Sequence, residues 1–180
     1  MEKQPVTFAM HMFDPSAPPA EMPPLAAWEG AECDSNFVSN ANVKARTEMI
    51  DGTHGVVTVT QVKVTLQLAI NIWVPEGAAK HVIEHEQGHR QISEHYYETA
   101  DKVAEQIAAT YLGKQVSASG ADLNAEVYKS LQQMGAEITA EYSRRLNPAL
   151  AQNRYDDNTD HGQNEVSAAE AVAEVVKDFP

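Results

Sequence analysis

Apolar and polar residues alternate over most of the segment from Val56 to Val74. One side of this alternation is aliphatic and consists of Val62, Val64, Leu66, Leu68, Ile70, Ile72 and Val74. A period of two predicts a β-strand with one face buried and the other in water. A strand is also predicted from Val43 to Ile50, and the Asp51-Gly52 pair between the two is typical of a hairpin turn. A further strand is predicted from Val6 to Phe13.

The pattern changes to helical spacing after Pro75-Glu76-Gly77. Apolar or small residues then recur mostly at intervals of three or four, at Ile83, Ile92, Tyr96, Ala100, Val103, Ile107 and Tyr111. They predict one long helix that ends at Gly113. A polar loop is expected at Gln115–Gly120. A second helix is predicted from Asp122 to Leu146, where near-heptad spacing favours an antiparallel position along the first helix. A last helix is predicted from Glu165 to Lys177.

The first predicted helix holds four of the seven histidines of the chain. Its segment His85-Glu86-Gln87-Gly88-His89 matches H-E-x-x-H, a pattern typical of zinc hydrolases. Residues four apart on a helix lie roughly 40° apart in projection, so His85 and His89 can point at one metal ion. Glu86 then lies beside that ion and can act as a general base toward a water that the metal activates. Gly88 costs about 1 kcal/mol inside a helix, and its missing side chain predicts the close approach of another backbone.

Two other histidine patterns overlap this motif. The segment from His81 to His85 matches the inverted string H-x-x-E-H, and His95 stands at the last histidine of the metzincin string. The metzincin string needs a glycine that breaks the helix, but Ile92 occupies that position and continues the apolar stripe. On an unbroken helix His95 projects about 120° from His89. We therefore prefer the H-E-x-x-H interpretation, since His89 lies deeper on the apolar stripe than His81.

The predicted turn from Tyr155 to Gly162 offers an imidazole that is distant in sequence. A catalytic zinc site has three protein ligands and one open position, so His161 in this turn is the predicted third ligand. The other candidates lie on the first helix and project away from His89 on an unbroken helix; they are Glu94, His95 and Glu98.

Polar neighbours of His161 are given supporting roles. Tyr155 is predicted to donate a hydrogen bond to a developing oxyanion. A carboxylate of the same turn is expected to orient a ligand histidine, and the candidates are Asp156, Asp157 and Asp160.

Composition limits the classes of protein that fit this chain. Its 180 residues, 43% of them hydrophobic, suffice for one globular core. The net charge of −13 disfavours nucleic acid as a partner. Cys33 is the only cysteine, which excludes an intrachain disulfide. No apolar run is long enough to span a membrane, and the start of the chain does not have the pattern of a signal peptide.

The chain is expected to consist of an extended, proline-rich arm, 1–41, packed on a single domain, 42–180. Five prolines between Asp14 and Leu25 predict an irregular segment. Trp28 and Phe37 are expected to pin the arm to the core, and Cys33 between them is expected to act as a small buried hydrophobe.

The chain resembles a family of uncharacterised bacterial proteins described as predicted secreted zinc-dependent proteases. The resemblance covers Val43 to Gly162 and rests on three features. These are the long strand ending in Trp73-Val74-Pro75, the His85-Glu86-Gln87-Gly88-His89 helix, and the spacing of Tyr155, Asp156, Thr159, His161 and Gly162.

This resemblance implies a zincin-like fold with His85, His89 and His161 as ligands of Zn²⁺ and Glu86 as general base. Members of the family usually carry an export signal. The resemblance therefore implies a periplasmic or secreted location if a leader has been removed, and the cytoplasm is expected otherwise.

The predicted fold is α+β and zincin-like, with an antiparallel-rich twisted sheet packed against a long active-site helix and a second, antiparallel helix. An edge of the Val62–Val74 strand, or of its hairpin partner, is expected to pair with an extended peptide. The predicted function is a zinc-dependent metallopeptidase that acts on a peptide or protein substrate. The alternative is a non-catalytic protein, either a metal buffer built on the helix histidines or a degenerate zincin that binds a partner. Substrate preference and oligomeric state stay open.

Overall fold

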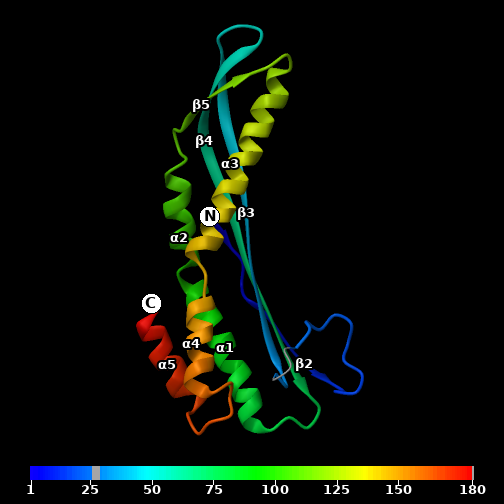
Figure 1. Cartoon of the computed structure of the whole chain (residues 1–180). Coiled ribbons are helices and arrows are strands. Elements are labelled where there is room, and N and C mark those ends of the chain that lie inside the picture. The colour runs from blue at the N-terminus through cyan, green and yellow to red at the C-terminus, as the bar shows by residue number, and fades with distance from the viewer. Residues whose placement is uncertain (26–28, 180) are drawn as a thin grey trace. The chain divides into compact units, whose positions relative to one another are not determined.

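The computed structural model describes residues 1–25 and 29–179. Its strands are β1 (Glu2–Lys3), β2 (Thr7–Phe13), β3 (Glu32–Met49), β4 (His54–Pro75) and β5 (Gln115–Ser119). Its helices are α1 (Lys80–Glu98), α2 (Ala100–Ala109), α3 (Leu123–Arg145), α4 (Ala149–Thr159) and α5 (Ala168–Asp178). The fold is therefore mixed α/β, as predicted (Figure 1).

The chain forms two compact units, each assembled from three segments. The first unit consists of Met1–Gln4, Val38–Gln67 and Thr99–Leu146. The second unit consists of Pro5–Phe37, Leu68–Glu98 and Asn147–Pro180, of which Pro180 and residues 26–28 are not described. Both units draw on the predicted arm 1–41 and on the predicted domain 42–180, and this division into domains stays a prediction.

The first unit is built on the predicted hairpin. The backbone N–H of Ile50 donates to the carbonyl of His54 at 2.9 Å and closes the turn between β3 and β4. Strand β5 runs antiparallel to β4, with Gly55 opposite Ala118. The polar loop predicted at Gln115–Gly120 is therefore wrong over Gln115–Ser119, because polar residues alternate there with small apolar ones that fit an edge strand.

Helix α3 covers this hairpin and confirms the predicted second helix. Its start is capped by the Asp122 side chain, which accepts from the N–H of Ala125 at 3.1 Å. One face packs on the strands in a cluster of Val57, Ala118, Leu123, Ala45, Val116, Val127 and Leu131. Helix α2 contacts α3, so the helix that lies against α3 in this unit is the second part of the predicted first helix.

The second unit places its helices on the aliphatic face of β4. Six residues of this face, which extends through both units, are each at most 1% exposed: Val64, Leu66, Leu68, Ile70, Ile72 and Val74. Ile72 and Val74 pack with Ala31 against Val82 and Ile83 of α1. Helices α1, α4 and α5 contact one another (Figure 1). Their shared core consists of Ile92, Ala151, Tyr155, Ala171, Val172 and Val175.

The sheet is not antiparallel-rich, and that prediction is wrong. Strand β1 runs parallel to β4 in the first unit, and β2 runs parallel to it in the second, from Thr7 opposite Ala69 to Phe13 opposite Pro75. The alternation of apolar residues reports which face is buried but not the direction of a neighbour. Because β4 pairs with β3 as well as with β2, it is an inner strand there, and only its hairpin partner β3 still fits the predicted substrate edge.

The predicted long helix is divided at Thr99, which has φ −97° and ψ 0°. Neither glycine nor proline marks this position, and the apolar stripe runs through it, so the sequence pattern gave no sign of the break. By contrast, α1 continues unbroken past Ile92 to Glu98. This continuity confirms the rejection of the metzincin pattern, because His95 stays on the same straight helix as His89.

Ring contacts support part of the predicted anchoring of the N-terminal segment. Phe37 meets Tyr97 edge to face, with ring centroids 6.3 Å apart, whereas Trp28 lies outside the described residues.

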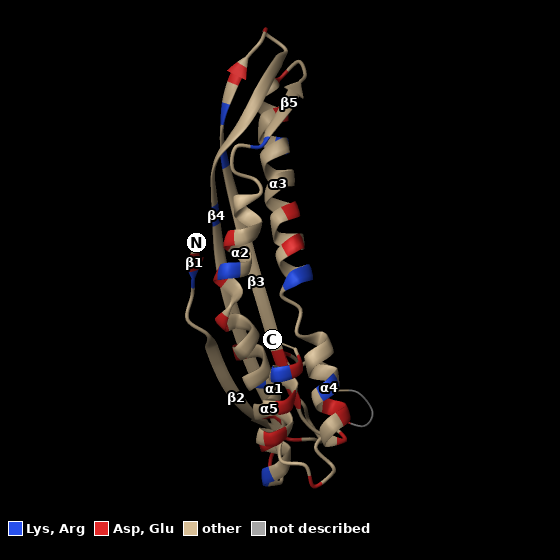
Figure 2. Ribbon diagram, turned by 90° about the vertical axis from the view of Figure 1, so that its left-hand side faces the viewer, with Lys and Arg blue, Asp and Glu red and all other residues tan. Residues whose placement is uncertain are grey.

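Asp and Glu residues are distributed over helices of both units with Lys and Arg among them (Figure 2). Within residues 1–25 and 29–179, the helices fall short of the length and hydropathy needed to cross a membrane.

Close packing of α3 on β3 yields a stability prediction for Gly135. A Cβ at this position would lie 2.7 Å from the carbonyl oxygen of Ala41. Alanine is favoured over glycine in a helix by about 1 kcal/mol, but overpacking costs roughly 1–3 kcal/mol. We expect Gly135→Ala to lower the thermal unfolding midpoint. Gly52→Ala, whose Cβ meets nothing within 4 Å, is the control and should leave the midpoint unchanged. A higher midpoint for Gly135→Ala would contradict this packing.

Candidate metal centre

The two motif histidines lie one turn apart on α1, in the second unit. Their Nε2 atoms are 3.1 Å apart. The Oδ1 atom of Asp156, on α4, lies 2.9 Å from Nε2 of His89 and 3.3 Å from Nε2 of His85. Each of the three side chains thus presents one potential ligand atom to a common point. Among the described residues, His85, His89 and Asp156 form a group whose ligand atoms lie close enough together to hold a metal ion.

The spacing of these atoms fits one small cation. Ligand atoms about 2.0–2.1 Å from a tetrahedral ion are separated from one another by about 3.3 Å. The three observed separations, 2.9, 3.1 and 3.3 Å, are close to that value. Two imidazoles and a carboxylate are also ligands that Zn²⁺ accepts. The residues present therefore fit a metal ion with part of its coordination left open.

Helix α4 brings the third of these atoms into place. The sequence predicts a turn from Tyr155 to Gly162, but Tyr155 to Thr159 form the last part of α4 and the turn begins only at Asp160. On a helix, Gln152, Asp156 and Thr159 follow one another at spacings of four and three and so share a face. This spacing is the signal in the sequence that could have identified Asp156 and its neighbours as a facing set.

The Nδ1 atoms of both histidines have partners on this face of α4. Nδ1 of His89 lies 2.6 Å from Oε1 of Gln152. Nδ1 of His85 lies 3.3 Å from the hydroxyl oxygen of Thr159, which in turn donates to the carbonyl of Tyr155 at 2.8 Å. Hydrogen bonds of this kind orient metal-binding histidines from behind. Gln152 was not identified from the sequence, and Thr159 was named there only as part of the family motif, without a role.

Two glycines make room for this arrangement. A Cβ on Gly88 would collide with the hydroxyl of Tyr155, which donates to the carbonyl of His85 at 3.0 Å. The close neighbour predicted at Gly88 is therefore a side chain and not a backbone. Gly162, with φ 77°, would place a Cβ 3.0 Å from the ring of His85.

Tyr155 itself is 0% exposed and stacks on the ring of His85, with centroids 5.0 Å apart. Its hydroxyl is occupied by the carbonyl of His85. The structure thus places Tyr155 against the histidine pair as a packing residue, and the oxyanion role predicted from the sequence has no support from this geometry.

His161 lies beside the group but not in it. Its Nδ1 is 3.8 Å from Oδ1 of Asp156, and its side chain is 44% exposed. Asp160 and His161 both have a left-handed backbone, with φ 47° and 50°. The structure thus groups Asp156 with the two motif histidines, whereas the sequence predicts a supporting role for one of Asp156, Asp157 and Asp160 and the third position for His161. The role of His161 as a ligand stays a prediction.

Charge and burial act strongly on the groups at this centre. Burial would raise the pKa of Asp156, but hydrogen bonds and charges from His85 and His89 outweigh it and hold that pKa well below its usual range. Burial lowers the pKa of His89, but the hydrogen bond and the charge of Asp156 more than offset this and raise it. Asp156 and His89 thus each favour the charged form of the other.

Glu86 is 6% exposed. Burial raises the pKa of Glu86 to about 7, with the charges of Glu32 and Asp156 acting in the same direction and that of His89 against them. A divalent cation at the centre would lower this pKa, because a positive charge favours the carboxylate. Burial also raises the pKa of Cys33 to about 12, but Cys33 is half-buried and not the fully buried small hydrophobe that the sequence predicts.

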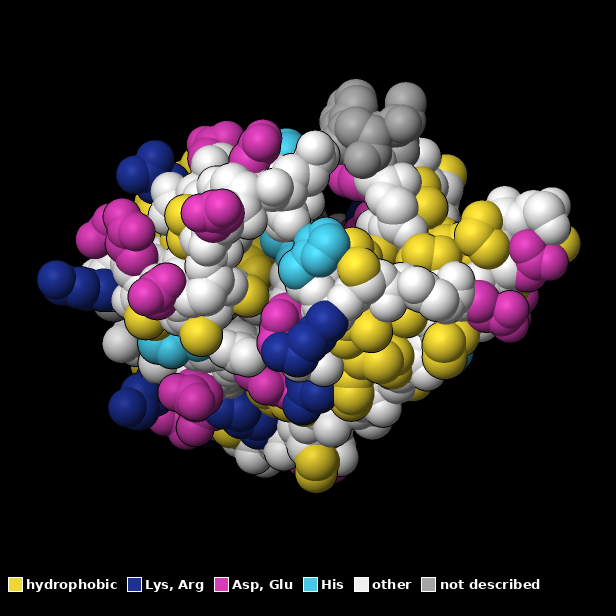
Figure 3. Space-filling view, turned by 90° about the horizontal axis from the view of Figure 1, so that it is seen from below, with side chains coloured by type: hydrophobic (Ala, Val, Ile, Leu, Met, Phe, Trp, Pro, Cys, Tyr) yellow, Lys and Arg dark blue, Asp and Glu magenta, His cyan; other side chains and the backbone are white. Residues whose placement is uncertain are grey.

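Apolar and charged side chains occupy different parts of one face of the molecule. In Figure 3, hydrophobic side chains gather on one side of the face shown and charged side chains on the other, with a histidine between them. A cavity of about 450 Å³ in the second unit is lined mainly by proline-rich residues between Phe13 and Gly30, and Glu29 is the one charged residue among those described.

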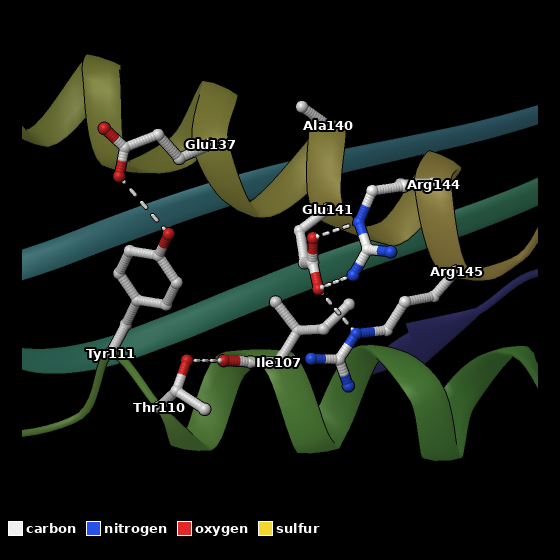
Figure 4. Close-up of a pocket in the computed structure, with 8 residues that line it drawn as sticks. All are labelled: Ile107, Thr110, Tyr111, Glu137, Ala140, Glu141, Arg144 and Arg145. Atoms are coloured by element: carbon white, nitrogen blue, oxygen red, sulfur yellow. Dashed lines mark hydrogen bonds and ion pairs between the residues drawn. The ribbon is translucent and has the colours of Figure 1, made fainter.

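A groove of about 470 Å³ lies between α2 and α3 in the first unit. In Figure 4 its charged side chains face one another: Glu141 accepts from Arg144 and Arg145 at 2.6–2.8 Å, and Tyr111 donates to Glu137 at 3.3 Å. The residues that line it include neither histidine nor cysteine. This groove therefore does not compete with the α1–α4 centre as a transition-metal site.

No protein-family model, curated protein or solved structure matches the chain. The assignment of a function thus depends on the geometry of the centre and on the motifs of the sequence.

The contact between Gly88 and Tyr155 gives a prediction about the stability of the second unit. We expect Gly88→Ala to destabilise the protein by roughly 2–3 kcal/mol, since the added methyl group must displace a fully buried ring. Tyr155→Leu removes that ring, so the double variant should be less destabilised than the sum of the single variants by at least about 1 kcal/mol. Unfolding by urea measures these free energies.

The matched control combines Gly88→Ala with Tyr97→Leu, a substitution of another tyrosine that is buried, at 3% exposure. Residues 88 and 97 are nine positions apart on one helix, so their effects should add. Additive behaviour of the Gly88 and Tyr155 pair as well would contradict the close contact.

Proposed function

We propose that the chain is a metal-dependent peptidase whose metal is held by His85, His89 and Asp156. The observation that carries this proposal is the convergence of two imidazole Nε2 atoms and one carboxylate oxygen, all within 3.3 Å of one another. Unprotonated Nε2 atoms and a carboxylate repel one another at such distances unless a proton or a cation lies between them. The H-E-x-x-H sequence on α1 supports a cation.

Zn²⁺ is the metal we propose. It accepts nitrogen and oxygen ligands in a tetrahedral arrangement, and three protein ligands leave one position open. When bound, such an ion polarises a carbonyl group and lowers the pKa of a water. The ligand side chains are 9% exposed at His85, 15% at His89 and 22% at Asp156, so a substrate can reach the centre on the side of Asp156.

Glu86 is the proposed general base. It follows the first proposed ligand on α1, it is 6% exposed, and the charges of His89 and Asp156 act on its pKa. These observations support the role. Its carboxylate would take a proton from the attacking water and give it to the nitrogen of the leaving amine. Burial excludes bulk water from this carboxylate and so strengthens its interaction with the reacting groups.

Strand β3 is the proposed site of substrate binding. Ser93 on α1 donates to Ser35 of β3 at 2.9 Å, so α1 lies directly against this strand. An extended peptide can add to the edge of such a strand through backbone hydrogen bonds. A strand next to the metal-ligand helix supports the zincin-like fold that the resemblance implies, and with it we propose the periplasmic or secreted location of that family.

A non-catalytic role is the second candidate. The buffer version needs several weak sites along α1, but His81 and His95 stand outside the group formed by the described residues that could hold a metal. The geometry favours one site instead. A degenerate zincin that binds a partner would keep this site and lose only the hydrolysis. An assay of peptide cleavage that depends on Glu86 therefore distinguishes the peptidase from the degenerate zincin.

The ligand set predicts which substitution releases the metal. We expect Asp156→Ala to weaken Zn²⁺ binding at least about 100-fold, because two histidines alone do not complete a site. His161→Ala should retain the metal if Asp156 is the third ligand. Competition with a chromophoric chelator measures both affinities, and His95→Ala is the control that should bind like the wild type. Loss of zinc from His161→Ala but not from Asp156→Ala would instead establish the ligand set that the sequence predicted.

Hydrolysis gives a separate prediction for Glu86. Glu86→Gln should keep the metal and lose at least about 100-fold in the rate of peptide cleavage, because the amide cannot accept the proton. The assay is mass-spectrometric detection of products from a broad peptide library. A wild type that binds one zinc and cleaves no peptide would favour the partner-binding protein, and an active Glu86→Gln variant would remove Glu86 from the mechanism.

A further inference from the structure

Gln152 makes three hydrogen bonds behind the metal centre, all within the second unit. Its Oε1 lies 2.6 Å from Nδ1 of His89. Its Nε2 donates to the carbonyl oxygen of His89 and to the hydroxyl oxygen of Ser93, both at 3.0 Å. One side chain of α4 thus contacts both the ring and the backbone of a single residue on α1.

These partners determine which end of the amide faces the ring. A backbone carbonyl can only accept, so the group beside the His89 carbonyl must be the NH₂ end. Ser93, which is 0% exposed, donates its own hydroxyl proton to Ser35 at 2.9 Å and therefore accepts from Gln152. A flipped amide would place its oxygen against the carbonyl of His89, and this arrangement is unfavourable.

The oxygen of Gln152 consequently faces Nδ1 of His89 and requires a proton there. The neutral ring with its proton on Nδ1 has its lone pair on Nε2. That atom is the one that points toward Asp156 and His85. The other groups that act on the ring are Tyr155, with ring centroids 4.8 Å apart, and the charged Glu86, whereas the hydrogen bond at Nδ1 is the one to Gln152.

We infer that Gln152 is a positioning residue that keeps the proton of His89 on Nδ1 and so reserves Nε2 for the metal. This inference rests on the proposed metal centre and adds to it a residue outside the ligand set. His85 has a weaker counterpart, since the hydroxyl of Thr159 lies 3.3 Å from its Nδ1 and is shared with the carbonyl of Tyr155. Gln152 is the stronger determinant because its orientation is held by two further bonds.

Two substitutions of similar length separate positioning from packing. Gln152→Met keeps the unbranched shape and removes every polar contact. Gln152→Glu keeps an acceptor for the Nδ1 proton but loses the two bonds that the NH₂ end donates. If Gln152 positions the ring, Gln152→Met should weaken Zn²⁺ binding about 10- to 100-fold and Gln152→Glu should restore part of the affinity. If Gln152 only fills space, the order of the two variants is reversed.

The measurements are zinc affinity by chelator competition and the visible absorption spectrum of the Co²⁺-substituted protein, which reports the ligand geometry. The spectrum of Gln152→Glu should lie closer to that of the wild type than the spectrum of Gln152→Met does. Asn153→Met, at the exposed neighbouring position on α4, is the matched control and should behave like the wild type. Equal affinity and equal spectra for Gln152→Met and the wild type would overturn the inference.

Failure of the proposed activity is distinguishable from failure of this inference. A wild type that binds zinc but cleaves no peptide rejects the peptidase, and the order of metal affinities still tests Gln152. A wild type that binds no divalent cation overturns both. Melting temperatures of the metal-free variants show whether a change of affinity accompanies a general loss of structure.

Discussion

The contact between α1 and α4 is the constraint on which the rest of the second unit depends. Tyr155 fills the space left by Gly88 and donates to the carbonyl of His85, and this fixes how closely the two helices approach. At that separation the carboxylate of Asp156 lies about one hydrogen-bond length from both imidazoles. A methyl group on Gly88 would disturb the packing and the proposed ligand set together, because one contact controls both.

This packing brings together three polar atoms whose electrostatic interactions determine what the centre can bind. Three atoms with lone pairs converge in a mostly buried place, and their mutual repulsion is relieved only by a proton or a cation. The pKa of Asp156 is held low by the two rings and that of His89 is raised in return. The centre thus favours positive charge between its members. A net charge of −13 over the whole chain acts in the same direction.

The strands of the sheet position the helices that carry the centre and contribute none of its three converging atoms. Strand β4 is covered on its aliphatic face by helices and pairs with β2 and β3 in the second unit, so it serves as an inner scaffold. Strand β3 contacts α1 through Ser35 and Ser93 and lies beside the centre. The chain of hydrogen bonds from Ser35 through Ser93 and Gln152 to His89 links the proposed substrate strand to a proposed ligand.

The sequence by itself determined the features that depend on local periodicity: the hairpin, the aliphatic face of β4, the α3 helix and the pairing of His85 with His89 on α1. Spacing decides these, since residues two, three or four apart share a face whatever surrounds them. Only the tertiary structure decided the parallel pairing of β2, the helical form of α4, and the grouping of Asp156 rather than His161 with the histidine pair. Those features depend on which distant segments pack together, and a close approach such as that of Tyr155 to Gly88 leaves no periodic trace along the chain.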